Sequence, residues 1–224
     1  MPARACKLRA RKVIGVRGPL CHRSPILIDM FEKSIFATIA VVISGLSFLP
    51  YIWSIFRGTI RPHVLSWSIW GLTTSIVFFA QRAGGAGVGA WPVGISALLA
   101  FSIAIIAYLK RADIRISTTD WLFFVLALLA IPLWAVTHNP VWAVLLVTFV
   151  DVLGFGPTIR KAYRQPQTES VLFFSLIVLR NIFVLLALEH YSVTTVLFPS
   201  AIGTMAAVVM MTVVLQRQAL ARLS

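Results

Sequence analysis

The chain has 224 residues, of which 59% are hydrophobic and only 12% charged, about half the charged share of a typical soluble domain. This composition excludes an ordinary soluble domain. The alternating ten-residue segments of a membrane barrel are also missing, so the sequence predicts an all-α, multi-pass membrane protein. The net charge of +13 then indicates contact with anionic lipid rather than with nucleic acid.

Seven apolar segments are long enough, or nearly so, to cross a bilayer, and Gly- and Pro-containing turns separate them. We expect transmembrane helices over residues 35–56, 64–81, 88–109, 121–136, 141–163, 170–188 and 193–216. The fourth segment is short, and we expect Pro132 to interrupt it.

Residues 1–30 differ from the rest of the chain, because they are basic, hold both cysteines and lack the continuous apolar stretch of a signal peptide. They are compatible with a transit peptide. Alternatively, translation starts at Met30 and the tail lies upstream of it.

Lysine and arginine concentrate on one side of the predicted membrane. The other side carries only Lys33 and Arg82, so the positive-inside rule predicts a cytoplasmic C-terminus and an N-terminus outside. The basic tail opposes this orientation, and a start at Met30 removes the conflict. The excess of arginine over lysine favours a bacterial plasma membrane, with an organelle membrane as the alternative. The side predicted to be cytoplasmic holds Arg57, Arg61, Lys110, Arg111, Arg115, Arg160, Lys161, Arg164, Arg217 and Arg222.

The chain repeats itself after 107 positions, because residues 44–109 align without a gap to residues 151–216 with 14 identities over 66 positions. The matches include Pro50 with Pro157 and Arg57 with Arg164. This repeat predicts two parallel three-helix units joined by a linker helix. The predicted divisions are a tail at 1–30, a first unit at 31–109, a linker at 110–138, a second unit at 139–216 and a C-terminal tail at 217–224.

The same helix ends carry a resemblance to a known family. The residues concerned are Pro50, Tyr51, Ile52, Arg57 and Ser66 in the first unit, and Pro157, Thr158, Ile159, Tyr163, Arg164 and Ser170 in the second. With the arrangement of three, one and three helices, they make the chain similar to the PQ-loop superfamily, which includes SWEET sugar transporters and lysosomal amino-acid exporters. The resemblance implies transport by alternating access. Tyr51 and Thr158 stand where the family has glutamine, and the third helix of each unit lacks the sugar-binding asparagine of SWEETs.

Polar residues at mid-helix depth are the candidate substrate pathway, because polar groups in hydrocarbon usually face a cavity or a partner. Asp151 and Arg180 lie at matched depth. They form either a structural ion pair, or a functional pair in which Arg180 binds a substrate carboxylate and Asp151 takes up a proton. Pro50 and Pro157 are either hinges or helix stops. The predicted pathway residues are Ser44, Thr73, Thr74, Ser96, Asp151, Arg180, Asn181 and Thr204.

No catalytic, cofactor-binding or metal-ligating motif is apparent, so we expect no enzyme activity, no cofactor and no metal. The sequence predicts a transporter of a small polar solute, a sugar or an amino acid, by uniport or linked to protons. The alternative is a non-transporting receptor or scaffold with the same bundle. The predicted partners are the solute, the lipid bilayer and protons, with no nucleic acid. Two fused units suffice for a pathway in a monomer, and a homo-oligomer remains an alternative.

Overall fold

The computed structural model describes residues 25–58, 62–110 and 118–223, and the chain is all-helical over these ranges. Residues 1–24, most of the predicted tail, lie outside this description. The helices are α1 (Pro25–Phe56), α2 (Val64–Ala83), η1 (Gly87–Ala90), α3 (Trp91–Leu109), α4 (Thr118–Thr137), α5 (Pro140–Arg164), η2 (Pro166–Thr168), α6 (Val171–Ala187) and α7 (Val193–Leu223).

Length and composition make a membrane-embedded bundle the natural interpretation of these helices. Six of them contain an apolar segment of at least 18 residues. The seventh long helix, α6, has 17 residues, or about 26 Å at 1.5 Å per residue, near the lower limit for a span. The six longer apolar helices are thus compatible with an integral, multi-pass membrane protein.

The structure corrects the expectation for Pro132 and excludes the helix-stop alternative for Pro50 and Pro157. Pro132 does not interrupt the fourth helix, because α4 continues through it to Thr137. Pro50 and Pro157 are not helix stops either, since α1 runs on to Phe56 and α5 to Arg164. In a long apolar helix the rest of the hydrogen-bond ladder holds the helix together across the one bond that proline removes.

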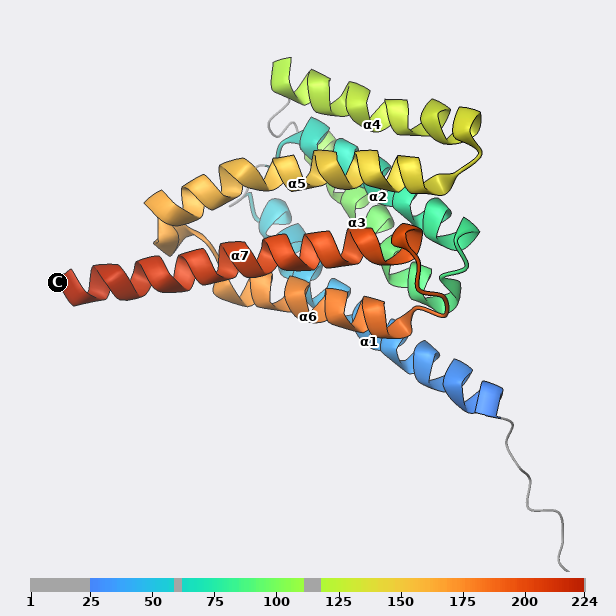
Figure 1. The fold of residues 1–224 in the computed structure, drawn as a ribbon. Coiled ribbons are helices and arrows are strands. Elements are labelled where there is room, and N and C mark those ends of the chain that lie inside the picture. The colour runs from blue at the N-terminus through green and yellow to red at the C-terminus, as the bar shows by residue number, and fades with distance from the viewer. Residues whose placement is uncertain (1–24, 59–61, 111–117, 224) are drawn as a thin grey trace, which may run out of the picture.

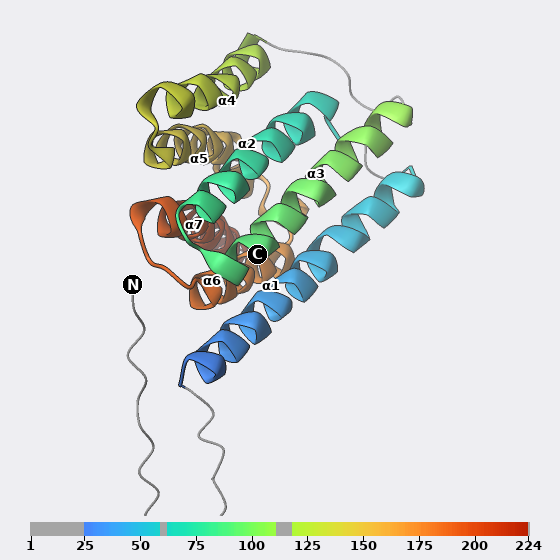
Figure 2. The same ribbon diagram turned by 90° about the vertical axis from the view of Figure 1, so that its right-hand side faces the viewer.

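The helices pack in two sets of three. Helix α3 packs against both α1 and α2 and lies between them, and α7 packs in the same way against α5 and α6 (Figures 1 and 2). Contacts of α1 with α6 and of α2 with α5 join the two sets. Helix α4 lies on the outside of the bundle against α5 and α2 (Figure 1).

The two ends of the bundle differ in character. At one end, which we call the contact end, the connection at residues 84–90 meets the connection at residues 188–192. At the other end, which we call the basic end, α1, α5 and α7 finish (Figure 1, left). The described basic residues of this end are Arg57, Lys110, Arg160, Arg164, Arg217 and Arg222.

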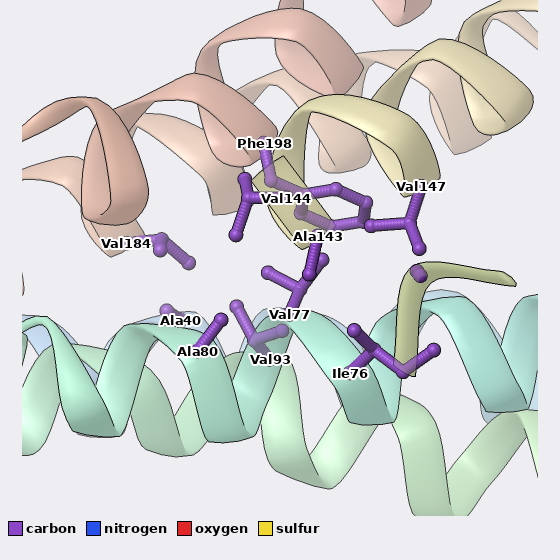
Figure 3. Close-up of a cluster of buried hydrophobic side chains, with 11 residues drawn as sticks. Ala40, Ile76, Val77, Ala80, Val93, Ala143, Val144, Val147, Val184 and Phe198 are labelled. Carbon is purple, nitrogen blue, oxygen red and sulfur yellow. The ribbon is translucent and has the colours of Figure 1, made fainter. Parts of the chain in front are cut away.

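The largest hydrophobic core lies toward the contact end and joins both sets of helices. Its members come from all seven long helices, and Figure 3 shows small side chains such as Val77 and Val144 meeting around Phe198. A second core around Phe174 and Val209 lies toward the basic end, and its buried members come only from α5, α6 and α7. The packing of this apolar core therefore joins the two sets of helices near the contact end.

A glycine at this end provides a test of the packing. A Cβ on Gly89 would lie 2.8 Å from the backbone of Ala187, so we expect Gly89→Ala to destabilise the protein by about 1–3 kcal/mol through overpacking. Gly45 in α1 is the matched control, because its Cβ would meet nothing within 4 Å. Thermal unfolding in detergent measures both, and equal melting temperatures for the two variants would contradict this packing.

Candidate functional site

Polar side chains from five helices are buried near the middle of the bundle. Thr73, Asp151 and Arg180 lie close to the midpoints of α2, α5 and α6, and all three are buried. Ser44 of α1 and Ser96 of α3 are buried beside them. The structure thus gathers five of the predicted pathway residues, and they form two separate groups, one around each charge.

The first group surrounds the Arg180 guanidinium. Nε donates to Ser44 Oγ at 2.8 Å, and Nη2 donates to Ser96 Oγ at 2.7 Å and to the Pro92 carbonyl at 3.0 Å. Nη1 lies 3.4 Å from Asn181 Oδ1. The two serine hydroxyls donate in turn to carbonyls four residues back on their own helices. Each serine hydroxyl therefore accepts a hydrogen bond from Arg180 and donates its own proton to a carbonyl, so no hydroxyl of this network has to donate twice.

The second group surrounds Asp151 and is far less complete. Thr73 Oγ1 lies 3.2 Å from Asp151 Oδ2 and also 3.2 Å from the Trp70 carbonyl. A hydroxyl has one proton, so Thr73 cannot fully serve both acceptors. Asp151 Oδ1 is buried without a hydrogen-bond partner among the described residues.

A direct ion pair between Asp151 and Arg180, one of the two alternatives from the sequence, does not form in the structure. No ion-pair contact joins them within the described part of the chain, and each charge is surrounded by neutral groups instead. Burying an ionised group without an opposite charge is expensive in an apolar medium. The bundle therefore holds two opposite charges in one layer, and neither neutralises the other by contact.

The remaining predicted residues divide between buried and exposed positions. Thr74 and Asn181 are buried, and Asn181 Nδ2 donates to the Ile177 carbonyl. Thr204 is exposed on α7 and takes no part in either group. The Gly203 position beside it approaches Asn181, because a Cβ there would lie 3.2 Å from the Asn181 Cβ.

Two groups in this layer were missed from sequence. One is the Pro92 carbonyl, a backbone acceptor that no side-chain pattern reveals. The other is Thr148, which is buried with a hydroxyl that has no partner among the described residues. Thr148 could have been found from the sequence, because it lies three residues before Asp151 and therefore on the same face of the helix.

Hydrogen bonds between the two sets of helices cluster at the contact end. The Glu189 backbone N–H donates to the Ala86 carbonyl at 3.2 Å. The Val88 backbone N–H donates to the Glu189 side chain, at Oε1, at 2.9 Å. Gln81 Nε2 donates to the Thr195 carbonyl at 2.8 Å. Gly87 has φ +60°, and a Cβ there would collide with the Glu189 carboxylate. These bonds and the shared core join the two sets of helices at the contact end.

Toward the basic end, an aromatic cluster around Trp67 belongs to the first set. Trp67 packs against Phe48, Tyr51 and Trp70 with ring centroids 5.1–6.0 Å apart. Trp70 reaches the second set, because its Nε1 would lie 3.9 Å from a Cβ on Gly154. Toward the basic end, Arg217 donates to the Pro166 and Glu169 carbonyls within the second set.

Comparisons with protein-family models, with curated proteins and with solved structures gave no match to this chain.

The Arg180 network predicts unequal effects for two neighbouring serines. Ser44→Ala leaves the buried Nε–H of Arg180 without an acceptor, so we expect it to cost about 1–3 kcal/mol of stability. Ser47 is also buried, three residues later, but its hydroxyl donates only to the Ile43 carbonyl. Ser47→Ala should therefore cost clearly less. Thermal unfolding in detergent measures both, and the excess cost of Ser44→Ala should disappear in an Arg180→Met background. An equal cost in the two backgrounds would contradict this role for Ser44.

Proposed function

We propose that the protein is a membrane transporter that moves a small carboxylate-bearing solute, such as an amino acid, by alternating access. The observation that carries the proposal is Arg180, a buried guanidinium in the middle of an apolar bundle with no anion in contact among the described residues. A guanidinium held by neutral acceptors keeps its positive charge available to an anionic group. Intramembrane charges of this kind commonly mark solute pathways.

We further propose that the two sets of helices are repeat units of one three-helix fold, with α4 as the linker. A shift of 107 positions turns Ser44 into Asp151 and Thr73 into Arg180. The contact between Ser44 and Arg180 is then equivalent to the contact between Asp151 and Thr73. Each joins the first helix of one unit to the second helix of the other, as a two-fold relation between the units requires.

The capping of the second helix in each unit supports the same relation. Helices α2 and α6 begin at equivalent positions, Val64 and Val171. Their caps, His63 and Ser170, are also 107 residues apart, and each side chain accepts a hydrogen bond from a backbone N–H three residues later. Together with the packing order of the helices, these matches support the similarity to PQ-loop transporters.

The unequal ends support movement of the two units relative to each other. At the contact end a core from all seven long helices and several hydrogen bonds join the units, whereas the second core belongs to one unit. In the proposed cycle this state is closed at the contact end. A rocking motion of the two units that closes the basic end and opens the contact end would then expose the polar layer to the opposite side of the membrane. Pro50 and Pro157, each one to two turns before the basic end, are the proposed hinges.

We assign the basic end to the cytoplasm, because cytoplasmic loops carry the excess of lysine and arginine. The contact end, with Lys33 and Arg82, then faces outward. A bacterial plasma membrane fits this arrangement.

Uptake into proteoliposomes tests the proposal directly. A panel of labelled amino acids, dicarboxylates and sugars should show uptake of one carboxylate-bearing solute. We expect Arg180→Gln to lower that uptake at least about tenfold, because a charge-assisted hydrogen bond contributes about 1.5–3 kcal/mol. Arg222→Gln, the same change at an exposed arginine of the basic end, should leave the rate unchanged.

Other outcomes separate the alternatives. Uptake of a sugar that is insensitive to Arg180→Gln would refute carboxylate recognition and leave a carrier of neutral solutes. If folded protein takes up none of the solutes, the proposed transport is refuted and a receptor or scaffold role replaces it. Acceleration by a pH gradient that is lost in Asp151→Asn would identify proton-linked transport.

A further inference from the structure

Two buried oxygen atoms without partners lie one turn apart on α5. Asp151 Oδ1 and Thr148 Oγ1 both lack a hydrogen-bond partner among the described residues, and the two side chains are only 6% and 5% exposed. Residues three apart on a helix are neighbours on one face, with Cβ atoms about 5–6 Å from each other. The two oxygens therefore belong to one small region of the bundle interior.

The state of Thr148 is unusual for this protein. Serine and threonine hydroxyls in apolar helices normally donate to the carbonyl four residues back, and Ser75 and Thr212 do so here, at 2.7 and 2.8 Å. The hydroxyl of Thr148 makes no such bond to the Val144 carbonyl. Its oxygen lone pairs remain available as a ligand in the interior.

Asp151 lacks compensation for its charge. It receives at most a share of the single Thr73 proton, and Arg180 donates its bonds elsewhere. A buried carboxylate in this position needs either a proton or a cation. The two Asp151 carboxylate oxygens and the hydroxyls of Thr148 and Thr73 are the kind of hard oxygen ligand that alkali cations accept in place of water.

We propose that Asp151 and Thr148, with Thr73 beside them, bind a small monovalent cation, either an alkali ion or a primary ammonium group. One carboxylate neutralises one positive charge. A divalent ion would leave an excess charge in the same buried layer as the Arg180 guanidinium, so the site selects a single charge.

The cation site extends the proposed function. Only the role of the bound cation, and not its binding, rests on the proposed transport. In a transporter, the bound cation would be the coupling ion, or the ammonium group of an amino acid whose carboxylate binds Arg180. Binding itself does not require transport. A protein that a cation stabilises but that moves no solute would refute transport and keep the site.

Cation-dependent thermal stability of the full chain in detergent tests the site, with the seven tryptophans as the fluorescence signal. Lithium, sodium, potassium and methylammonium chloride are compared with choline chloride at equal ionic strength and pH. We expect one of the four to raise the melting temperature by about 2–4 °C at about five times its Kd. A response to alkali ions identifies an ion site, and a response to methylammonium alone identifies an ammonium subsite.

Three variants assign the effect to the site. Thr148→Val and Asp151→Asn should abolish the cation-dependent shift, and Thr212→Val, which removes a hydroxyl bonded within its own helix, should retain it. If Asp151→Asn does not fold, Thr148→Val decides. The proposal is overturned if no cation stabilises the wild type, if stability changes with pH alone, or if the shift persists in Thr148→Val.

Discussion

The structure depends on the burial of two opposite charges that do not touch. Asp151 and Arg180 lie in one layer of an apolar bundle, and each contacts hydroxyl groups from the other set of helices. A direct ion pair would have satisfied both charges and closed the layer. Holding them apart on neutral partners keeps one group able to bind an anion and the other able to bind a cation or a proton.

The rest of the bundle explains how such a layer can be maintained. Small side chains from all seven long helices pack closely at the contact end, and connecting segments bond to each other above them. At the basic end the aromatic group around Trp67 and the core around Phe174 belong to different sets of helices. The two sets thus share a core and hydrogen bonds at one end, whereas the clusters at the other end each belong to one set. An unequal join of this kind is what the proposed alternating access needs.

Much of this could be predicted from the sequence, and the failures have physical reasons. The positions of the helices follow from the long apolar segments. Ser44, Asp151 and Arg180 could be selected because polar residues in the middle of such segments stand out in the sequence. The effect of Pro132 was predicted wrongly because a long apolar helix tolerates one missing hydrogen bond. Which face a side chain occupies depends on packing, so the sequence did not reveal that Thr204 is exposed and belongs to neither polar group.

The measurement that tests alternating access most directly is transport by a protein locked at the contact end. Val88 and Glu189 can be changed to cysteine, with Cys6 and Cys21 replaced by serine, and joined by a short thiol-reactive cross-linker. The two positions are close, because the Val88 backbone N–H donates a hydrogen bond to the Glu189 carboxylate at 2.9 Å. The account predicts that cross-linked protein stops exchanging solute and recovers when a cleavable linker is cut. A cross-link within one set, from Val88 to a cysteine at Arg82, should leave exchange intact. Full transport by the protein locked between Val88 and Glu189 would contradict the account.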